Sequence, residues 1–288
     1  MFVIILEGCD ILKRKIRIKL KNVFLALFIL ILITTLIISS INIIKWLIDS
    51  KNTKEEIEII NDEVNVIEVE DSAETEIINT ETEKIEKENP YWDYIKMDLI
   101  NVDFNELKQK NSETAGWLQV GGTNINYPFV QAKNNDFYLT HSFDKSYNKS
   151  GWVFMDYRNN KKEFNKNTII YAHGRMNNTM FGSLRKVLTN GWLDNNNNHI
   201  IKLSTEQENT LWQVFSVYVI PTTNDYIQVN FSDNQEFLEF GNKLLNRSEF
   251  NFKTNINKDD KILTLSTCYN DEKKTVLHAK LIKREKKG

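Results

Sequence analysis

An uncharged, strongly apolar run over residues 23–44 is the feature that most constrains this chain. At about 1.5 Å per residue, a helix of this length can cross a hydrocarbon core of about 30 Å. A basic cluster precedes the run, made of Lys13, Arg14, Lys15, Arg17, Lys19 and Lys21. Because basic flanks stay in the cytoplasm, we expect a cytoplasmic tail at 1–22 and a transmembrane signal anchor at 23–48. A cleaved signal peptide is the alternative, but the run is longer than a typical signal core.

The segment over residues 49–89 is acidic, and from residue 47 to residue 90 the chain contains no aromatic residue. Such a composition favours a disordered or partly helical spacer, here one that holds a domain away from the membrane. Pro90 ends the spacer, and we expect the folded domain at 90–288. The net charge of the whole chain is -2, which gives no reason to expect a nucleic-acid partner.

After residue 116, short stretches of alternating apolar and β-branched residues follow one another between turn residues. Helical spacing is confined to residues 91–110, where two short helices are expected, and to residues 232–247, where Ser232 is the expected N-cap. Many strands at short spacing with few helices predict a mainly β protein built as a closed barrel.

Two of the predicted strands end in residues that can do chemistry together. Cys268 follows the strand-like residues 261–267, and His173 follows the strand-like residues 168–172. A cysteine with an imidazole partner is a nucleophile and its acid/base group. The alternative for Cys268 is a small buried hydrophobic side chain. His278 is a second candidate for the partner, because it lies in the strand after Cys268.

Other chemistries have no support in the sequence. The four histidines lack the spacing of metal ligands, and no CxxC, HExxH, P-loop or GxGxxG occurs. We therefore expect neither a metal site nor a cofactor. Cys9 is predicted to lie on the other side of the membrane from Cys268, so no disulfide between them is expected.

Several sequence blocks resemble class B sortases in the same order. These are GWLQVGGTNINYPFVQAKNNDFYL at 116–139, GWVFMDYRN at 151–159, YAHGRMNNTMFGSL at 171–184 and TLSTC at 264–268. The resemblance covers roughly residues 91–283. It implies an eight-stranded barrel with N-terminal helices and a helix before the cysteine strand, which matches the place of residues 232–247.

The resemblance also implies roles for individual residues. Cys268 is similar in position to the family nucleophile and His173 to its acid/base. The position of the family arginine is occupied by Lys274, which keeps the charge but loses the planar fork of donors. Lys274 either takes over that role or is a solvated loop lysine, in which case Lys273 or Arg175 is the alternative.

Further positions resemble those that line the recognition groove of the family. They are Ser266, Thr267, Tyr171, Asn135, Leu139, Thr222, Tyr226 and Ile227. Each of them has packing as its alternative role.

The activity implied by the resemblance is that of a cysteine transpeptidase. Such an enzyme cleaves a C-terminal sorting motif of a surface protein, holds the acyl fragment as a thioester on Cys268, and transfers it to a peptidoglycan amine. The pentapeptides of class B are of NPQTN type or nearer to SPxTG, and the sequence does not choose between them. A hydrolytic cysteine peptidase and a weakly active or inactive binding barrel are the alternatives; papain-like enzymes place Cys before His, the reverse of the order here.

Overall fold

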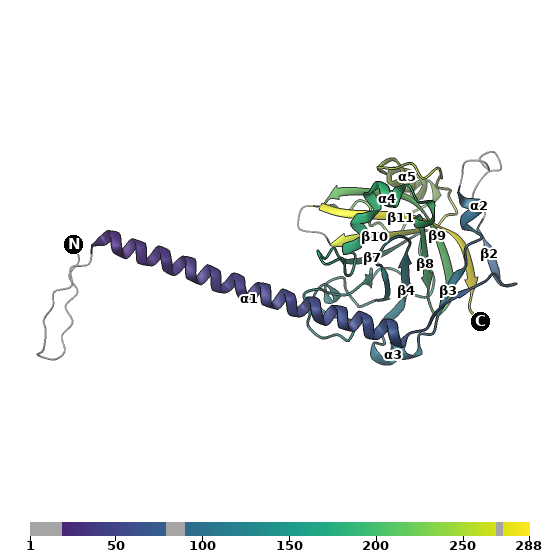
Figure 1. Ribbon diagram of the computed structural model, residues 1–288. Helices are drawn as coiled ribbons and strands as arrows, with labels where there is room; N and C mark the ends of the chain where they lie inside the picture. Colours follow the sequence, from purple (N-terminus) through teal and green to yellow (C-terminus); the bar gives the residue numbers. More distant parts are fainter. Residues whose placement is uncertain (1–18, 79–89, 269–272) are drawn as a thin grey trace, which may run out of the picture. The chain divides into compact units, whose positions relative to one another are not determined.

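The computed structural model describes residues 19–78, 90–268 and 273–288. The chain divides into two compact units, residues 1–49 and residues 50–288 (Figure 1). Cys9, most of the predicted cytoplasmic tail and the end of the predicted spacer lie outside the described residues.

Apart from the long helix α1, the described chain is mainly β, with short helices between the strands. The helices are α1 (Leu20–Glu63), α2 (Tyr91–Tyr94), α3 (Asn105–Lys110), α4 (Asn190–Leu193) and α5 (Asn234–Asn246), with 3-10 turns η2 (Phe137–Leu139), η3 (Gly182–Leu188) and η4 (Asn196–Asn198). The strands are β1 (Val66–Val69), β2 (Thr75–Ile77), β3 (Leu99–Val102), β4 (Thr114–Val120), β5 (Asn126–Val130), β6 (Phe154–Met155), β7 (Asn167–His173), β8 (Ile200–Ser204), β9 (Glu208–Pro221), β10 (Ile262–Cys268) and β11 (Lys273–Lys286).

Eight of these strands close into a barrel in the order β10-β7-β6-β5-β4-β8-β9-β11, and the pairing of β10 with β11 completes the circle. β10 runs parallel to β7, and β5 runs parallel to β6; the other neighbours are antiparallel. β2 is added beside the C-terminal part of β11, and β1 pairs with β3 in a small separate sheet. The predicted eight-stranded barrel is confirmed.

The first unit contains the apolar part of α1. This helix is long and apolar enough to cross a membrane, and its apolar window near the N-terminus has no buried residue. The uncharged run that the sequence singled out, residues 23–44, lies entirely within this helix.

The second unit begins with the last turns of α1 and includes much of the acidic segment. Thr53 and Ile60 of α1 are buried, with 0% and 3% of their surface exposed. The Lys283 ammonium, which is fully buried in β11, pairs with Asp71 at 2.6 Å and donates to the carbonyl of Met97 at 2.7 Å. The described part of the predicted spacer therefore packs against the barrel. The pairing of β1 with β3 and of β2 with β11, a sparse apolar stripe and several ion pairs hold it there, and its acidic composition gave no sign of this.

The segment over residues 91–110 contains a strand between its two short helices. The expected helices are present as α2 and α3, but Leu99–Val102, in a segment where only helical spacing was expected, forms β3. β3 pairs antiparallel with β1, from Val66 opposite Val102 to Val69 opposite Leu99. The partner strand comes from the acidic segment, so the prediction missed β3 for the same reason that it missed the packing of the spacer.

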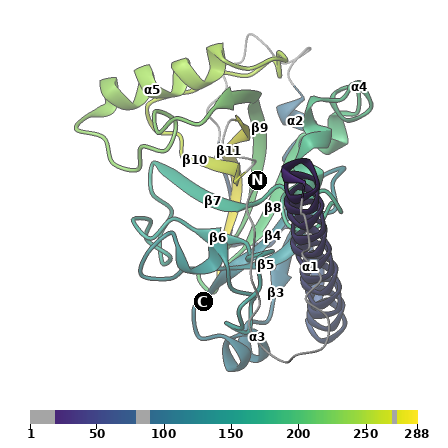
Figure 2. The same cartoon turned by 90° about the vertical axis from the view of Figure 1, so that its left-hand side faces the viewer.

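The barrel wall has two apolar faces that explain the alternation along β10. Leu263 and Leu265 belong to the main core cluster. Ile262 belongs to a second cluster, which also contains Phe237 and Phe240 of α5. α5 thus covers the outer face of the wall beside β10, in the place where the resemblance put a helix (Figure 2). The same strand ends at Cys268.

Candidate active site

The ends of two parallel strands bring the predicted cysteine and histidine together. β10 and β7 pair in register from Ile262 opposite Asn167 to Cys268 opposite His173. Neighbouring strands lie about 4.8 Å apart, so the two backbones are adjacent at this position. Parallel strands end at the same edge of a sheet, which is why two residues so far apart in sequence meet here.

His173 is held in place by the segment around η2. Its Nε2 lies 2.7 Å from the carbonyl oxygen of Leu139, and the imidazole is half-buried. A carbonyl only accepts, so this contact requires a hydrogen on Nε2 and leaves Nδ1 as the acceptor of the neutral ring. Such an arrangement fixes both the orientation and the tautomer of the acid/base candidate.

Gly151 allows this close packing. Its φ is +61°, and an added Cβ would lie 2.5 Å from the carbonyl oxygen of Tyr138 and 3.0 Å from Cδ2 of His173. A side chain at position 151 would therefore displace the histidine or the backbone that orients it.

His278, the competing histidine, lies in a closed environment. It is fully buried, its Nδ1 lies 2.8 Å from Oγ1 of Thr264, and its Nε2 lies 2.8 Å from the hydroxyl of Tyr218. Burial lowers the pKa of His278 to about 3, with a smaller contribution from Arg247. Both ring nitrogens are thus occupied, and the ring stays neutral at physiological pH.

Lys274 lies on the other side of β10. It is half-buried near the start of β11. The ladder between β10 and β11 pairs Ser266 with Val276, and continuing this antiparallel register by two residues brings Cys268 opposite Lys274. His173 is thus the register partner of Cys268, and Lys274 lies on the strand that flanks β10 on the other side, two residues beyond the last pair of the ladder.

The two alternatives to Lys274 occupy different surroundings. Arg175 donates from Nη2 to the hydroxyl of Ser50 in α1 at 2.8 Å. Lys273 is exposed and pairs across the sheet with Pro221 of β9. Arg175 is therefore engaged by the helix, and Lys273 lies at the very end of the ladder.

Two of the predicted groove residues meet on one carboxylate that the sequence did not single out. Nδ2 of Asn135 lies 3.0 Å, and the hydroxyl of Tyr171 lies 2.9 Å, from Oδ2 of Asp156. Arg158 binds the same carboxylate through Nε and Nη2, at 2.8 and 2.7 Å. The D-x-R spacing directly after the strand-like GWVFM was the available signal for this pair.

A second pair of groove candidates joins the loop at 222–233 to β10. The hydroxyls of Tyr226 and Ser266 lie 2.9 Å apart, and both side chains are buried. Ile227 is half-buried, and its carbonyl accepts a hydrogen bond from Nη2 of Arg158 at 3.0 Å.

The remaining groove candidates are placed less uniformly. Thr267 is fully buried, and its Oγ1 accepts from the backbone N–H of Thr275 at 2.9 Å, which ties β10 to β11. Thr222 is exposed at the start of the loop, and Leu139 is half-buried beside His173.

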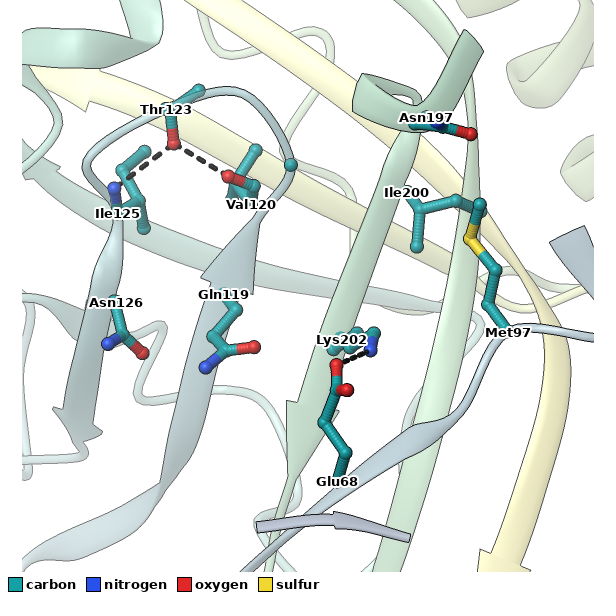
Figure 3. Close-up of a pocket in the computed structure, with 11 residues that line it drawn as sticks. Glu68, Met97, Gln119, Val120, Thr123, Ile125, Asn126, Asn197, Ile200 and Lys202 are labelled. Carbon is teal, nitrogen blue, oxygen red and sulfur yellow. Dashed lines mark hydrogen bonds and ion pairs between the residues drawn. The ribbon is translucent and has the colours of Figure 1, made fainter. Parts of the chain in front are cut away.

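A hollow of about 460 Å³ lies away from these residues (Figure 3). It is lined by residues of β1, β4, β5, η4 and β8 and of the turn between β4 and β5, among them Gln119, Asn126 and Asn197. Its Glu68 and Lys202 form an ion pair at 2.6 Å, and Oγ1 of Thr123 both donates and accepts within the turn. These polar groups serve the scaffold, and none of the predicted site residues lines the hollow.

The described part of the chain offers no cluster of metal ligands. Among residues 19–78, 90–268 and 273–288, no group of three or more His, Cys, Asp or Glu side chains could hold a metal ion. A cysteine and an oriented histidine lie at the ends of adjacent strands. This is the arrangement of a cysteine-dependent acyl-transfer enzyme.

Comparison with known proteins agrees with this class. The family model of the sortase domain matches residues 118–282. Sortase B of Staphylococcus aureus is 35% identical over 188 residues, which cover 64% of this chain and 76% of that protein. A crystal structure from Bacillus anthracis, described as similar to sortase B, is 40% identical with a TM-score of 0.58, covering 63% of this chain and 83% of the other.

A further solved structure of sortase B, a complex with triglycine, is 35% identical with a TM-score of 0.59 and covers 62% of this chain and 85% of the other. The chain belongs to the sortase family, in its class B, and is a sortase cysteine transpeptidase.

Proposed function

We propose that this protein is a membrane-anchored transpeptidase that joins surface proteins to the cell wall. It cleaves a C-terminal sorting motif, keeps the acyl fragment as a thioester on Cys268, and passes it to a peptidoglycan amine. The observation that carries the proposal is the register of β7 and β10, in which Cys268 is the partner of His173.

The first half of the reaction forms the thioester. The Cys268 thiol gives its proton to Nδ1 of His173, and the resulting thiolate attacks the carbonyl carbon of the scissile peptide bond. The C–N bond breaks after the C–S bond has formed, and His173 gives its proton to the departing amine. In the second half, His173 takes a proton from the incoming amine, whose nitrogen displaces the sulfur.

Lys274 is proposed to stabilise the oxyanion that forms at each attack. The register of β10 and β11 leads it toward Cys268, and its ammonium supplies the charge that a developing oxyanion needs. Lysine offers a point charge where an arginine would offer a planar fork, so Lys274 is expected to bind one oxygen at a time.

An amine acceptor is favoured over water by one comparison. Triglycine is the ligand of a solved sortase B structure to which this chain is similar. A short glycine peptide presents a free amine at the end of an extended backbone, which is the kind of nucleophile that the proposed transfer requires.

The experiment is a mass measurement of the full-length protein in detergent after mixing with peptides that carry NPQTN or SPKTG. Wild type is expected to gain the mass of the acyl fragment on Cys268, and the Cys268→Ala variant is expected to gain none. Added triglycine should convert the product from free acid to the triglycine conjugate. Product that stays free acid at saturating triglycine would make the protein a hydrolase.

Anchoring by α1, with the N-terminus in the cytoplasm, is the second part of the proposal. The apolar helix and the basic residues before it support this orientation. Protease added to intact cells stripped of their wall is expected to remove residues 50–288. Full protection of that unit would contradict the orientation.

A further inference from the structure

One buried carboxylate collects an unusual number of donors just after β6. Asp156 is fully buried. It accepts from the backbone N–H and the guanidinium of Arg158, from the amide of Asn135 and from the hydroxyl of Tyr171, all at 2.7–3.0 Å. A buried carboxylate is stable only when its lone pairs are occupied in this way.

The charge state of this carboxylate follows from the same contacts. Burial by itself would raise the pKa of Asp156, but the hydrogen bonds from Arg158, Asn135 and Tyr171 outweigh it, and the net pKa is lowered. Burial, and then the charge of Asp156, raises the pKa of Tyr171, so its hydroxyl remains a donor. Asp156 and Arg158 are therefore both ionised, and the orientation of each partner is fixed.

The partners come from separate segments that surround the reacting pair. Asn135 opens the segment that ends at Leu139, whose carbonyl orients His173. Tyr171 lies two residues before His173 on β7. Asp156 thus hydrogen-bonds both to the segment whose Leu139 carbonyl orients His173 and to the strand that carries His173.

Arg158 extends the connection to a third segment. Its Nη2 lies 3.0 Å from the carbonyl oxygen of Ile227, in the loop between β9 and α5. The guanidinium reaches Asp156 through two nitrogens and the loop through one of them. A lysine ammonium cannot hold a carboxylate in a fork and bind a loop carbonyl with the same fixed geometry.

The loop at 222–233 also meets the barrel near the nucleophile. Tyr226 is bonded to Ser266, two residues before Cys268, and Nδ2 of Asn167 donates to the carbonyl of Gln228 at 2.8 Å. These contacts hold the middle of the loop to β7 and β10. Arg158 holds its Ile227 carbonyl to the segment after β6.

We propose that the Asp156–Arg158 pair positions the recognition groove for an extended sorting peptide. The inference rests on the proposed function and deepens it. The pair sets the spacing between the 135–139 segment, β7 and the 222–233 loop, and it acts on peptide binding without touching the reacting atoms. Arg158 is therefore a positioning residue, and its loss raises KM for the peptide more than it lowers kcat.

The test compares Arg158→Gln with Arg284→Gln in the full-length protein. Arg284 is a matched control, because its guanidinium also binds a carboxylate, that of Glu76, at 2.8 Å on a different part of the sheet. Arg158→Gln is expected to raise KM for the NPQTN or SPKTG peptide at least tenfold, with kcat within threefold of wild type. Labelling of Cys268 by iodoacetamide, followed by mass spectrometry, should change less than twofold. Arg158→Lys should fall between wild type and Arg158→Gln.

An unchanged KM in Arg158→Gln, with only a lower melting temperature, would overturn the inference and leave the pair a structural ion pair. Amide hydrogen exchange gives a readout that does not need turnover: residues 226–229 should exchange faster in Arg158→Gln and not in Arg284→Gln. If wild type cleaves no peptide, the proposed function fails. The exchange rates of residues 226–229 then test by themselves whether Arg158 positions the loop. Unchanged exchange in Arg158→Gln would then overturn it.

Discussion

The central strand β10 is flanked by two strands that each carry a histidine, and the two histidines differ in almost every physical respect. His173 is the register partner of Cys268, at the end of β7, while His278 is the register partner of Thr264, inside the β10–β11 ladder. One ring is half-buried with its Nε2 on a backbone carbonyl. The other is fully buried with both nitrogens engaged by side-chain hydroxyls.

The difference distinguishes a candidate acid/base group from a buried histidine of the barrel wall. An acid/base group must exchange its proton with substrate, which requires access and a nitrogen that is not already committed. Position in the sequence alone cannot decide this, whereas burial and hydrogen-bond partners do. His278 has neither access nor a spare nitrogen, so it serves the packing of the barrel wall beneath α5.

The largest expected effect separates the two histidines by activity. His173→Ala is expected to lower turnover about 10²–10⁴-fold, the usual cost of losing a general acid/base. His278→Ala should stay within about threefold of wild type, measured at a temperature where the variant is folded. Steady-state cleavage of a fluorogenic sorting peptide checks both, and equal losses in the two variants would remove the distinction. If His278→Ala does not fold, His278→Asn takes its place.

Lys274 allows a second comparison with His278. Both lie on β11, but Lys274 is near the start of the strand, where β10 ends at Cys268. If Lys274 serves the oxyanion, Lys274→Ala should lower kcat about 10²–10³-fold with a smaller change in KM. Lys274→Arg should retain or raise activity, since the guanidinium offers more donors. Changes below about threefold in both variants would place Lys274 in solvent and turn attention to Arg175 or Lys273.

The structural role of His278 predicts a loss of stability. His278→Ala removes one hydrogen-bond partner each from the Tyr218 and Thr264 hydroxyls in a buried region, and Thr264 keeps its bond to Oδ1 of Asn167 at 2.7 Å. Leaving a buried polar group unpaired costs about 1–3 kcal/mol. Urea unfolding of His278→Ala should show at least this loss, whereas half-buried His173→Ala should show less. The reverse order would contradict the burial argument.

The burial of His278 also predicts a pH dependence of stability. The pKa of His278 in the folded protein, about 3, lies below its ordinary value of 6.5, so the fold favours the neutral ring. Its contribution to stability is complete above about pH 6.5 and is lost as the pH falls toward 3, at up to about 1.4 kcal/mol per pH unit. Unfolding free energies of wild type and His278→Asn should differ in slope over this range. Parallel slopes would show that His278 does not carry the effect.

Much of this arrangement could be predicted from local patterns. Period-two alternation located the strands that end at His173 and Cys268, and short strand spacing indicated the barrel. The N-cap of α5 was predicted one residue too early, because it is Asp233 and not Ser232. The carboxylate of Asp233 accepts from the N–H of Glu236 at 2.9 Å, while Ser232 donates to the side chain of Glu236, so the two neighbours share the end of the helix.

What local patterns could not supply is pairing over long separations. The parallel register of β7 and β10, and the contacts of Asp156 with Asn135 and Tyr171, depend on closure of the whole barrel. The acidic segment shows the same limit, since one half-exposed carboxylate, Asp71, is committed to a lysine far along the chain. The composition of a segment therefore does not show whether it packs, because packing depends on contacts with residues far away in the sequence.

The most direct test of the account is a cross-link between the two strand ends. In a Cys9→Ser background, His173→Cys puts two thiols at register partners, where the distance between strands falls within the Cα range of about 4.4–6.8 Å for a disulfide. His278→Cys is the control, because its partner Thr264 lies four residues from Cys268, or about 13 Å at about 3.3 Å per residue. After mild oxidation, peptide mass mapping should find a 173–268 disulfide in the first variant and none in the second. A cross-link from position 278 to Cys268, with none from position 173, would contradict the pairing of Cys268 with His173.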